Sequence, residues 1–331
     1  MSETPSWMLY GATGFTGTLI AQHAHARGHR PVLAARSTPG VTALAEKLDL
    51  PHQTLTLDDP DRLRAALADV DLVLTAAGPF LHTATPLAEA CIDAGTHYLD
   101  ISNELQVFRT LYDLDARARQ ADVLLIPGVG FGVVATNCLA RHVSDAAGGA
   151  EHLEVAALAA TAQPGPGVAA TREQNIPFGG WIRRDGQLHP LELGEGITTI
   201  ALPDGPAQIM PVPTGDLEAA FEATGVANIT AYTVLRAPAA ADPQTSGEDG
   251  AGSRTFESFG WARATGPDGA TAEAWLRTGD AYVFTAEASI RAVEEACVGS
   301  RRGACSPATA FGPDFAFTVP NTTRIDTIPV L

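Results

Sequence analysis

The sequence predicts an α/β protein: a Rossmann-type, doubly wound parallel sheet, followed by a second α+β domain with a mixed or antiparallel sheet. Short apolar runs alternate with helical patterns over the first 130 residues, and a glycine-rich turn follows the first run. Beyond residue 130 the alternation gives way to longer, strand-like segments. Repeated β-α units of this spacing imply parallel strands. We therefore expect a nucleotide-binding domain at 1–130 and a substrate domain at 131–331, whose C-terminal tail is free to pack back on the first domain.

The expected elements of the first domain alternate regularly. A continuous apolar run such as Val70–Ala76 is typical of a strand that is buried on both faces. A helical pattern that stops at a glycine, such as Phe15–Arg27 before Gly28, indicates a helix end. Strands are expected at 6–10, 31–35, 53–57, 70–76, 97–101 and 123–126, and helices at 15–27, 40–48, 61–68, 86–94 and 104–120.

The second domain has fewer clear signals. The turn Gly266-Pro-Asp-Gly269 predicts an antiparallel hairpin, because Pro presets φ and Gly permits a positive φ. Residues 238–253 contain few large apolar side chains, so a mobile loop is expected there. The other expected elements are the hairpin strands 256–264 and 270–279, a strand at 152–161, and helices at 133–143 and 285–296.

Composition and charge exclude several classes of protein. The 331 residues carry a net charge of −17, which repels nucleic-acid backbones and anionic lipid surfaces. The longest apolar run, Val123–Ala135, is too short to cross a bilayer, and no signal peptide is readable at the N-terminus. We expect a cytoplasmic protein with a small-molecule substrate and no nucleic-acid or membrane partner; a homodimer is compatible with the sequence.

Cysteine and lysine usage narrows the chemistry further. The four cysteines form no Cys-x-x-Cys pair and no metal-ligand pattern, so we expect free thiols and no metal. A Cys297–Cys305 disulfide is the less favoured alternative. The one lysine is Lys47, and its neighbours fit neither a P-loop nor the Tyr-x-x-x-Lys dyad of short-chain dehydrogenases. The cysteines are Cys91, Cys138, Cys297 and Cys305.

A glycine-rich turn, Gly11-Ala-Thr-Gly-Phe-Thr-Gly17, lies between the first expected strand and helix. Glycines at such a turn let the backbone approach a pyrophosphate, and the helix N-terminus offers free N–H groups to it. The motif therefore predicts dinucleotide binding; the alternative is a glycine-rich turn with no ligand. The binding residues expected here are Gly11, Thr13, Gly14, Phe15 and Thr16.

The end of the second expected strand indicates which dinucleotide binds. NAD-binding proteins place an acidic residue there for the ribose hydroxyl, whereas this chain has Arg36 and Ser37. Arginine pairs well with a 2′-phosphate, so we expect NADP(H) as the cofactor. The alternative is that Arg36 is an ordinary surface arginine.

Two further strand ends are expected to complete the cofactor site. Small residues at Ala77, Gly78 and Pro79 would let the backbone pass close to the ribose and nicotinamide, and Phe80 could pack on the ring. Asp58, after the third strand, could accept the adenine amino group, although an Asp at such a place more often caps a helix or turn.

The proton donor is less clear from the sequence. Tyr98 and His82 are the two candidates, with Asp100 placed to orient Tyr98; each could equally be structural or solvated. Glu104 lies at the same edge of the sheet. Asp216 and Tyr232 are weaker candidates for substrate contacts in the second domain.

Several motifs resemble those of the saccharopine dehydrogenase-like NADP-binding oxidoreductases, most closely the branch of the trans-acting enoyl reductases. The resemblance implies an NADP-binding Rossmann domain, a second domain with a mixed sheet, and reduction of a C=C or C=N bond. The family usually has Pro-Thr-Asp (or Pro-Ser-Asp) at 135–137 and Gly at Asn103, and its segment before the hairpin is longer. The motifs are at 11–17, 34–37, 75–80, 95–104, 127–140, 215–232 and 303–317.

These observations favour an NADPH-dependent reductase of a polarised double bond. The expected substrate is an α,β-unsaturated carbonyl compound of specialised metabolism, free or bound to a carrier as a thioester. An imine or carbonyl reductase is the near alternative. The altered residues Ala135-Thr136-Asn137 also motivate a non-redox NADP(H)-binding protein, such as a nucleotide sensor or a repurposed cyclase or isomerase.

Overall fold

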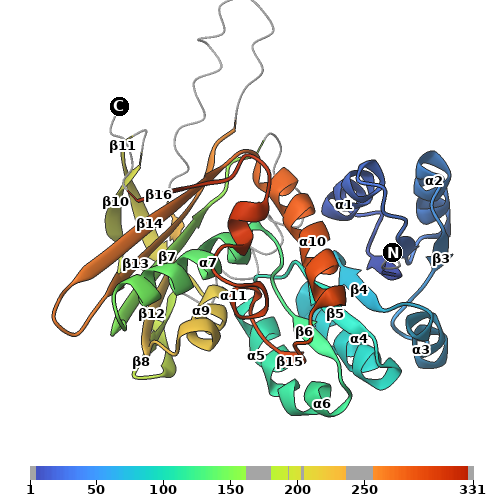
Figure 1. Ribbon diagram of the computed structural model, residues 1–331, viewed down its shortest axis with the longest axis horizontal. Helices are drawn as coiled ribbons and strands as arrows, with labels where there is room; N and C mark the ends of the chain where they lie inside the picture. The colour runs from blue at the N-terminus through green and yellow to red at the C-terminus, as the bar shows by residue number, and fades with distance from the viewer. Residues whose placement is uncertain (1–4, 162–179, 193, 203–204, 236–255, 327–331) are drawn as a thin grey trace, which may run out of the picture.

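The chain folds into two β-sheets with helices packed between and around them (Figure 1). The computed structural model describes residues 5–161, 180–192, 194–202, 205–235 and 256–326. The loop expected at 238–253 lies outside the described residues. Within the described part, no helix has both the length and the apolar character that crossing a bilayer requires.

The first sheet is entirely parallel and doubly wound. Its strands are β1 (Trp7–Tyr10), β2 (Val32–Ala35), β3 (His52–Thr54), β4 (Leu72–Thr75), β5 (His97–Asp100), β6 (Leu124–Ile126) and β15 (Gly303–Ala304). They lie in the order β15-β6-β5-β4-β1-β2-β3, so the chain winds outward from β1 in one direction and from β4 in the other. This confirms the predicted fold class, although β3 and β4 are clearly shorter than the strands expected at 53–57 and 70–76.

Helices cover both faces of this sheet, which explains why every residue of β1 and β4 is buried. One face packs against the helices α1 (Phe15–Ala26), α2 (Thr38–Leu48) and α10 (Ala281–Val298). The other face packs against α3 (Pro60–Ala68), α4 (Phe80–Ala94), α5 (Leu105–Asp113) and α6 (Asp115–Gln120).

Two helix boundaries in this domain differ from the prediction. Helix α4 begins at Phe80, not at Pro86, and Pro86 lies inside it. The loss of one backbone hydrogen bond at an exposed proline is outweighed by the buried contacts of Ala84 and Leu87 on either side. The single helix expected at 104–120 is divided at Leu114 into α5 and α6.

The second sheet is mixed and mostly antiparallel. Its strands are β7 (His152–Leu158), β8 (Gly180–Arg184), β9 (Gln187–Leu191), β10 (Thr198–Leu202), β11 (Gly205–Pro211), β12 (Asn228–Val234), β13 (Ser258–Thr265), β14 (Thr271–Thr278) and β16 (Thr323–Ile325). Within this second sheet, β7 and β12 are the only described neighbours that pair in parallel. Strands β13 and β14 form the predicted hairpin, with Gly269 at a φ of +78° in its turn.

Helix α7 (Phe131–Ala146) lies between the second sheet and helix α10 (Figure 1). It is buried around most of its circumference, and its buried residues include the polar Thr136, Asn137 and Ser144. Gly260 on β13 lets it approach the sheet, since a Cβ there would lie 3.0 Å from the Cβ of Ala135. Two short helices, α9 (Asp216–Thr224) and α11 (Pro307–Phe311), also pack against α7.

The segment after α10 returns to the first sheet. Strand β15 pairs in parallel with β6, and the Gly303 N–H donates to the carbonyl oxygen of Val123 at 2.8 Å. The Ala304 N–H donates to Asp115 Oδ1 at 2.8 Å. The first sheet therefore contains residues from both ends of the described chain.

Charged side chains join helices α1 and α10. Glu287 lies 2.7 Å from His23 Nδ1 and accepts a hydrogen bond of 2.9 Å from Arg27. Glu294 pairs with the same Arg27 at 2.8 Å and with His29 Nε2 at 2.9 Å. Partial burial raises the pKa of Glu287, but its hydrogen bonds to His23 and Arg27 outweigh that effect and hold the pKa below its ordinary value.

We expect Glu287→Gln to lower the free energy of unfolding at pH 7 by about 1 kcal/mol, because the carboxylate is a partly buried ion-pair partner. A lowered folded-state pKa stabilises the fold at pH values above the unfolded pKa of 4.5. That stabilisation is lost as the pH falls through the folded pKa, so the difference between wild type and variant should shrink toward pH 3. Urea denaturation at several pH values measures the difference in the free energy of unfolding between wild type and Glu287→Gln. Glu295→Gln, at an exposed position of the same helix, is the control; an equal loss there would contradict the prediction.

Candidate active site

The candidate site lies where the two halves of the parallel sheet separate, between the carboxyl ends of β1 and β4. Ligands of doubly wound sheets bind at this point. The turn after β1 and the loop after β4 touch there, because a Cβ on Gly11 would lie only 2.7 Å from the backbone nitrogen of Ala77. Gly11 also has a φ of +82°, which side-chain-bearing residues rarely adopt. Only glycine at position 11 allows the two loops to meet.

The N-terminus of α1 opens from this turn without a side-chain cap. Gly14 precedes the helix, and Thr13, Gly14 and Phe15 are exposed while Thr16 is half-buried. A Cβ on Gly17 would lie 2.2 Å from the carbonyl oxygen of Gly11, so the helix can pack on the turn only with glycine there. The first N–H groups of a helix have no partner within it and attract anions. The turn can therefore hold a pyrophosphate.

Arg36 and Ser37 lie beside this turn, at the end of β2. Both are exposed, and Ser37 precedes α2 without using its hydroxyl as a cap. A Cβ on Gly40 would lie 3.3 Å from Thr13 and 3.4 Å from the Ser37 hydroxyl, which places Thr13 and Ser37 close together. None of the ion pairs within the described ranges involves Arg36. A guanidinium and a hydroxyl are thus available to a second phosphate.

Asp58 lies on the same side of the turn. Burial raises the pKa of Tyr10. The positive charge of Arg36 lowers this pKa and the negative charge of Asp58 raises it, so both side chains lie near the Tyr10 hydroxyl. The hydroxyl of Thr56 holds the pKa of the exposed Asp58 below its ordinary value. Asp59, not Asp58, caps α3 by accepting the Arg62 N–H at 3.1 Å. Asp58 therefore does not cap α3, which was one of the roles that the sequence allowed for it.

The loop after β4 carries the other expected cofactor residues. Ala77 is half-buried, Gly78 and Pro79 are exposed, and Phe80 is the first residue of α4. The Thr83 hydroxyl donates to the carbonyl oxygen of Ala77 at 2.6 Å and fixes the loop against the helix. Phe80 packs partly against the apolar core beneath the loop.

The two expected proton donors lie in different surroundings. His82 is exposed on the first turn of α4, rather than in a loop as expected. Tyr98 is fully buried, and its hydroxyl donates to Asp100 Oδ2 at 2.8 Å. Burial, followed by the charge of Asp100, raises the pKa of Tyr98 well above its ordinary value. This geometry favours a supporting role for Tyr98.

Asp100 holds together the loops at the end of β5 and β6. Its Oδ1 accepts hydrogen bonds from the Ser102 N–H at 2.8 Å, the Ser102 hydroxyl at 2.6 Å and the Gly128 N–H at 2.9 Å. Burial raises the pKa of Asp100, and these hydrogen bonds lower it in part. The carboxyl group is fully enclosed, so its role is to position the loops around it.

A buried polar cluster forms where the first domain meets α9. Asp216 accepts hydrogen bonds from Thr136 and from the Thr214 hydroxyl, the latter at 2.7 Å. The backbone carbonyl oxygen of Asn103 accepts a hydrogen bond from the Gly215 N–H, and the Asn103 side chain lies beside Asp216. Burial raises the pKa of Asp216, which these bonds partly offset. The sequence singled out Asp216 and Asn103 separately; the threonines carried no signal, since their hydroxyls meet only through the tertiary fold.

The N-terminus of α10 also reaches the glycine turn. The rings of Phe15 and Tyr282 pack edge to face with their centres 4.9 Å apart. The Thr285 hydroxyl accepts the Phe131 N–H at 3.1 Å, which joins α10 to the start of α7. Sequence analysis did not identify Tyr282, because nothing in a helix start predicts which distant turn it will contact.

Two sets of residues that the sequence singled out in the second domain lie away from the crevice. Tyr232 is not placed at the crevice: its hydroxyl donates to Glu154 at 3.1 Å, burial raises its pKa to about 12, and it packs on the face of the sheet opposite α7. Residues Ala135 and Asn137 do not line the substrate side either, since both are buried in the core around α7. The Asn137 side chain donates to the carbonyl oxygen of Ala219 and accepts the Ala308 N–H. The changes at 135–137 therefore act on packing.

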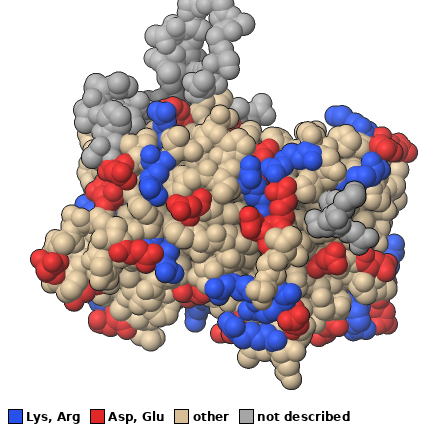
Figure 2. All heavy atoms as spheres, viewed as in Figure 1, with Lys and Arg blue, Asp and Glu red and all other residues tan. Residues whose placement is uncertain are grey.

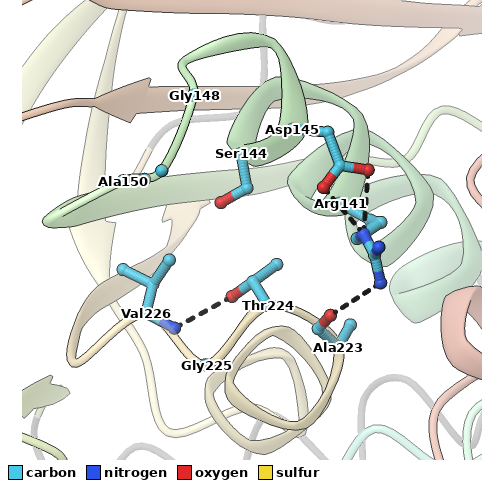
Figure 3. Close-up of a pocket in the computed structure, with 10 residues that line it drawn as sticks. Arg141, Ser144, Asp145, Gly148, Ala150, Ala223, Thr224, Gly225 and Val226 are labelled. Atoms are coloured by element: carbon cyan, nitrogen blue, oxygen red, sulfur yellow. Dashed lines mark hydrogen bonds and ion pairs between the residues drawn. The ribbon is translucent and has the colours of Figure 1, made fainter.

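Two cavities among the described residues lie away from the crevice. A cavity of about 470 Å³ lies between the C-terminal ends of α7 and α9, where the Ser144 hydroxyl faces Thr224 and Arg141 pairs with Asp145 (Figure 3). Another, of about 430 Å³, adjoins His97 and Cys297 at the opposite edge of the first sheet. Neither is lined by an expected site residue.

No metal-binding cluster of three or more His, Cys, Asp or Glu side chains occurs in the described ranges, and the four cysteines are free thiols. Figure 2 shows acidic and basic side chains interspersed on the visible face rather than gathered by sign. The chemistry of the site therefore rests on backbone N–H groups, one arginine and buried carboxyl groups.

Comparison with known families identifies the first domain. Residues 7–126 match the family described as the saccharopine dehydrogenase NADP binding domain. A trans-acting enoyl reductase of Mycobacterium tuberculosis is 36% identical over 132 residues, and one of Mycobacterium ulcerans is 32% identical over 144 residues. These matches cover 38% and 41% of this chain. They span about a third of the relatives' own length (32% and 34%).

A solved structure shares the fold over nearly the whole chain. The apo saccharopine dehydrogenase (L-Glu forming) of Saccharomyces cerevisiae superposes with a TM-score of 0.64, covering 97% of this chain and 100% of that one. The two sequences are only 11% identical, so the likeness concerns the fold alone. It extends to the mixed second sheet, beyond the region that the family match covers.

Two glycines of the turn should respond differently to the same substitution. We expect Gly17→Ala to lower the free energy of unfolding by about 2–3 kcal/mol, because its Cβ would overlap a backbone oxygen at 2.2 Å. Gly14→Ala should lower it by less than about 1 kcal/mol, since its nearest neighbour would be 3.4 Å away and its φ of −71° suits alanine. Urea denaturation of both variants measures the difference, and equal losses would refute this view of the turn.

Proposed function

Because residues 7–126 belong to the saccharopine dehydrogenase NADP-binding domain family, we propose that this chain is an NADPH-dependent reductase of a polarised carbon–carbon double bond. The domain implies an NAD(P) cofactor and an oxidoreductase of that family. Our choice of NADPH as the cofactor and of an α,β-unsaturated carbonyl compound as the substrate goes beyond what the family match implies. The geometry of the crevice supports this choice.

The observation that carries the proposal is the fit of the glycine turn to a dinucleotide. Cβ atoms at Gly11 and Gly17 would strike backbone atoms at 2.7 Å and 2.2 Å, so the turn is built for close approach. The N-terminus of α1 above it has no side-chain cap. In this proposal the N–H groups at Phe15 and Thr16 hold the pyrophosphate, with the exposed Thr13 beside them.

Arg36 and Ser37 support the preference for the phosphorylated cofactor. Arg36 is exposed without an ion-pair partner among the described residues, and the free hydroxyl of Ser37 lies next to Thr13. An arginine fork and a hydroxyl match a 2′-phosphate in charge and in hydrogen-bonding geometry. Asp58 is free to accept the adenine amino group.

The remaining residues position the substrate and exclude water. When bound, the cofactor supplies a hydride for the electrophilic carbon of the substrate. The backbone at Gly78 and Pro79 leaves room for the nicotinamide, and Phe80 forms the floor of that space. His82 lies exposed on the same first turn of α4, two residues after Phe80, where it can contact the substrate. Tyr98 and Asp100 hold the neighbouring loops in place beneath the site.

Exposed apolar side chains around the crevice support an acyl substrate. Phe15, Leu81 and Val283 are 46%, 42% and 43% exposed, and they begin the helices α1, α4 and α10. The Phe15–Tyr282 contact places the starts of α1 and α10 next to each other. A hydrocarbon chain on the substrate, free or in thioester linkage to a carrier, would cover this apolar rim.

The cofactor preference depends on Arg36. We expect Arg36→Ala to raise the Kd of NADPH by about 10- to 150-fold, which corresponds to the 1.5–3 kcal/mol of a hydrogen bond to a charged group. The Kd of NADH should change less than threefold (roughly 0.6 kcal/mol). Isothermal titration with both cofactors measures the change. Arg64→Ala on α3 is the control, since Arg64 pairs only with the exposed Asp61 among the described residues. Equal losses for the two cofactors would refute the 2′-phosphate assignment.

The reaction itself is tested by the disappearance of NADPH absorbance. Purified protein is mixed with NADPH and a panel of enones, crotonyl-pantetheine and longer 2-enoyl thioesters, with cyclic imines and ketones as the comparison set. We expect oxidation with the enoyl compounds, faster for longer acyl chains, and a saturated product by mass spectrometry. Oxidation with imines or ketones alone would identify the reaction as C=N or C=O reduction. Tight NADPH binding without oxidation by any acceptor would indicate a non-redox protein.

A further inference from the structure

Glu104 occupies the point where the first domain, the loop after β4 and the second domain meet. It precedes α5 and is only 5% exposed. Its backbone forms an isolated antiparallel bridge with Thr214, just before α9. The adjoining Asn103 carbonyl oxygen accepts the Gly215 N–H at 2.9 Å. The position of Glu104 is therefore fixed from both domains.

The segment that carries Glu104 leaves β5 beside the loop that we assign to the nicotinamide, because β4 and β5 pair in parallel with Thr75 opposite Asp100. Its Oε2 accepts the Asn103 N–H at 2.9 Å. The Phe80 N–H, at the start of α4, also stabilises the carboxylate form. Because Phe80 ends the Gly78–Phe80 segment, Glu104 lies at the same edge of the sheet as the loop that we assign to the nicotinamide.

The other ionisable groups at this edge of the sheet are less suited to deliver a proton. Tyr98 and Asp100 are fully buried and bonded to each other. Both carboxylate oxygens of Asp216 already accept threonine hydroxyls. His82 is exposed to solvent on the outer turn of α4. Glu104 is the carboxyl group among them that is shielded from water and lies near the start of α4, next to the proposed nicotinamide loop.

We infer that Glu104, in its carboxylic acid form, is the proton donor of the reduction. The inference rests on the proposed function. The O–H bond of Glu104 breaks and a new C–H bond forms at the α-carbon of the enolate that remains after hydride addition to the β-carbon. The glutamate is left as a carboxylate, which the N–H groups of Asn103 and Phe80 stabilise, and water returns the proton after the product leaves. One hydride from NADPH and one proton are thus added across the double bond.

The electrostatic surroundings agree with this role. Burial raises the pKa of Glu104, the amides of Asn103, Glu104 itself and Phe80 lower it, and the nearby charge of Asp100 raises it again. The net effect is a pKa above the ordinary value, so the acid form is populated closer to neutral pH. General acids work best when their pKa lies near the working pH.

Proton release on cofactor binding tests this placement without any turnover. NADP⁺ carries a positive nicotinamide ring and NADPH a neutral one, and an opposite charge within about 4–6 Å lowers a carboxyl pKa by 1–3 units. We expect wild-type protein to release protons on binding NADP⁺ and clearly fewer on binding NADPH, because only NADP⁺ brings a positive ring that favours the carboxylate. Isothermal titration calorimetry in buffers of different ionisation enthalpy measures the released proton.

Substitution assigns that proton to its residue. Glu104→Gln should abolish the difference in proton release between NADP⁺ and NADPH, while changing the Kd of NADPH less than about threefold (roughly 0.6 kcal/mol). Glu104→Asp should retain a difference in proton release between the two cofactors. Glu89→Gln on α4, an exposed glutamate that pairs with Arg117, is the matched control and should behave like wild type. The inference would be overturned if Glu104→Gln still released more protons with NADP⁺ than with NADPH. It would also be overturned if wild-type protein showed no such difference, and that measurement is decisive even if Glu104→Gln does not fold.

The kinetic arm uses the best enoyl acceptor of the panel. We expect Glu104→Gln to lower kcat by about 10²-fold or more and to remove the alkaline decline of the wild-type kcat–pH profile. His82→Ala should alter kcat less than tenfold. Wild-type rates and profile in Glu104→Gln, or a larger loss in His82→Ala, would refute the inference and leave the reductase assignment intact. Failure of wild type to bind either cofactor would instead overturn the proposed function, and this inference with it.

Discussion

The close contact between the glycine turn after β1 and the loop after β4 is the constraint on which the candidate site depends. Gly11 allows Ala77 to approach within a distance that no Cβ would tolerate, and Gly17 lets α1 start directly on the turn. These contacts bring together a helix N-terminus without a cap, the end of β2 with Arg36, and the loop that leads into α4. The parts of the site that we propose for the phosphates and the nicotinamide are thus set by a single packing arrangement.

The second domain completes the site through α10 and the segment before α9. Phe15 and Tyr282 join the starts of α1 and α10, and the Arg27–Glu287 and Arg27–Glu294 pairs join their later turns. Helix α10 therefore links the phosphate-binding helix to α7 and, through it, to the second sheet. The bridge between Glu104 and Thr214 makes the corresponding link on the other side of the crevice.

Local signals in the sequence were enough to predict the fold class, and they singled out the strand ends that the fold brings together around the glycine turn. The alternation of buried strands such as β4 with helices predicted the parallel sheet, and the Gly-Pro-Asp-Gly turn predicted the β13–β14 hairpin. The start of α4 was predicted too late, because buried packing on both sides of Pro86 outweighs the local preference of proline. Tyr232 and Asn137 were misplaced because the face to which a strand or helix residue points depends on which layer covers it. The cluster of Asp216, Thr136 and Thr214 assembles from two distant segments, α7 and residues 214–216, and no pattern in either of them indicates it.

The return of the chain to β15 has a consequence for how the protein is made. Strand β6 lies at the edge of the first sheet until Gly303 and Ala304 pair with it. On the ribosome, the residues of the second sheet are synthesised before this partner emerges, so β6 spends that interval with unpaired N–H and C=O groups. Unpaired strand edges invite association with other chains. Chaperone protection during translation, and fragment boundaries for recombinant work, are therefore governed by the residues beyond α10 rather than by the end of β6.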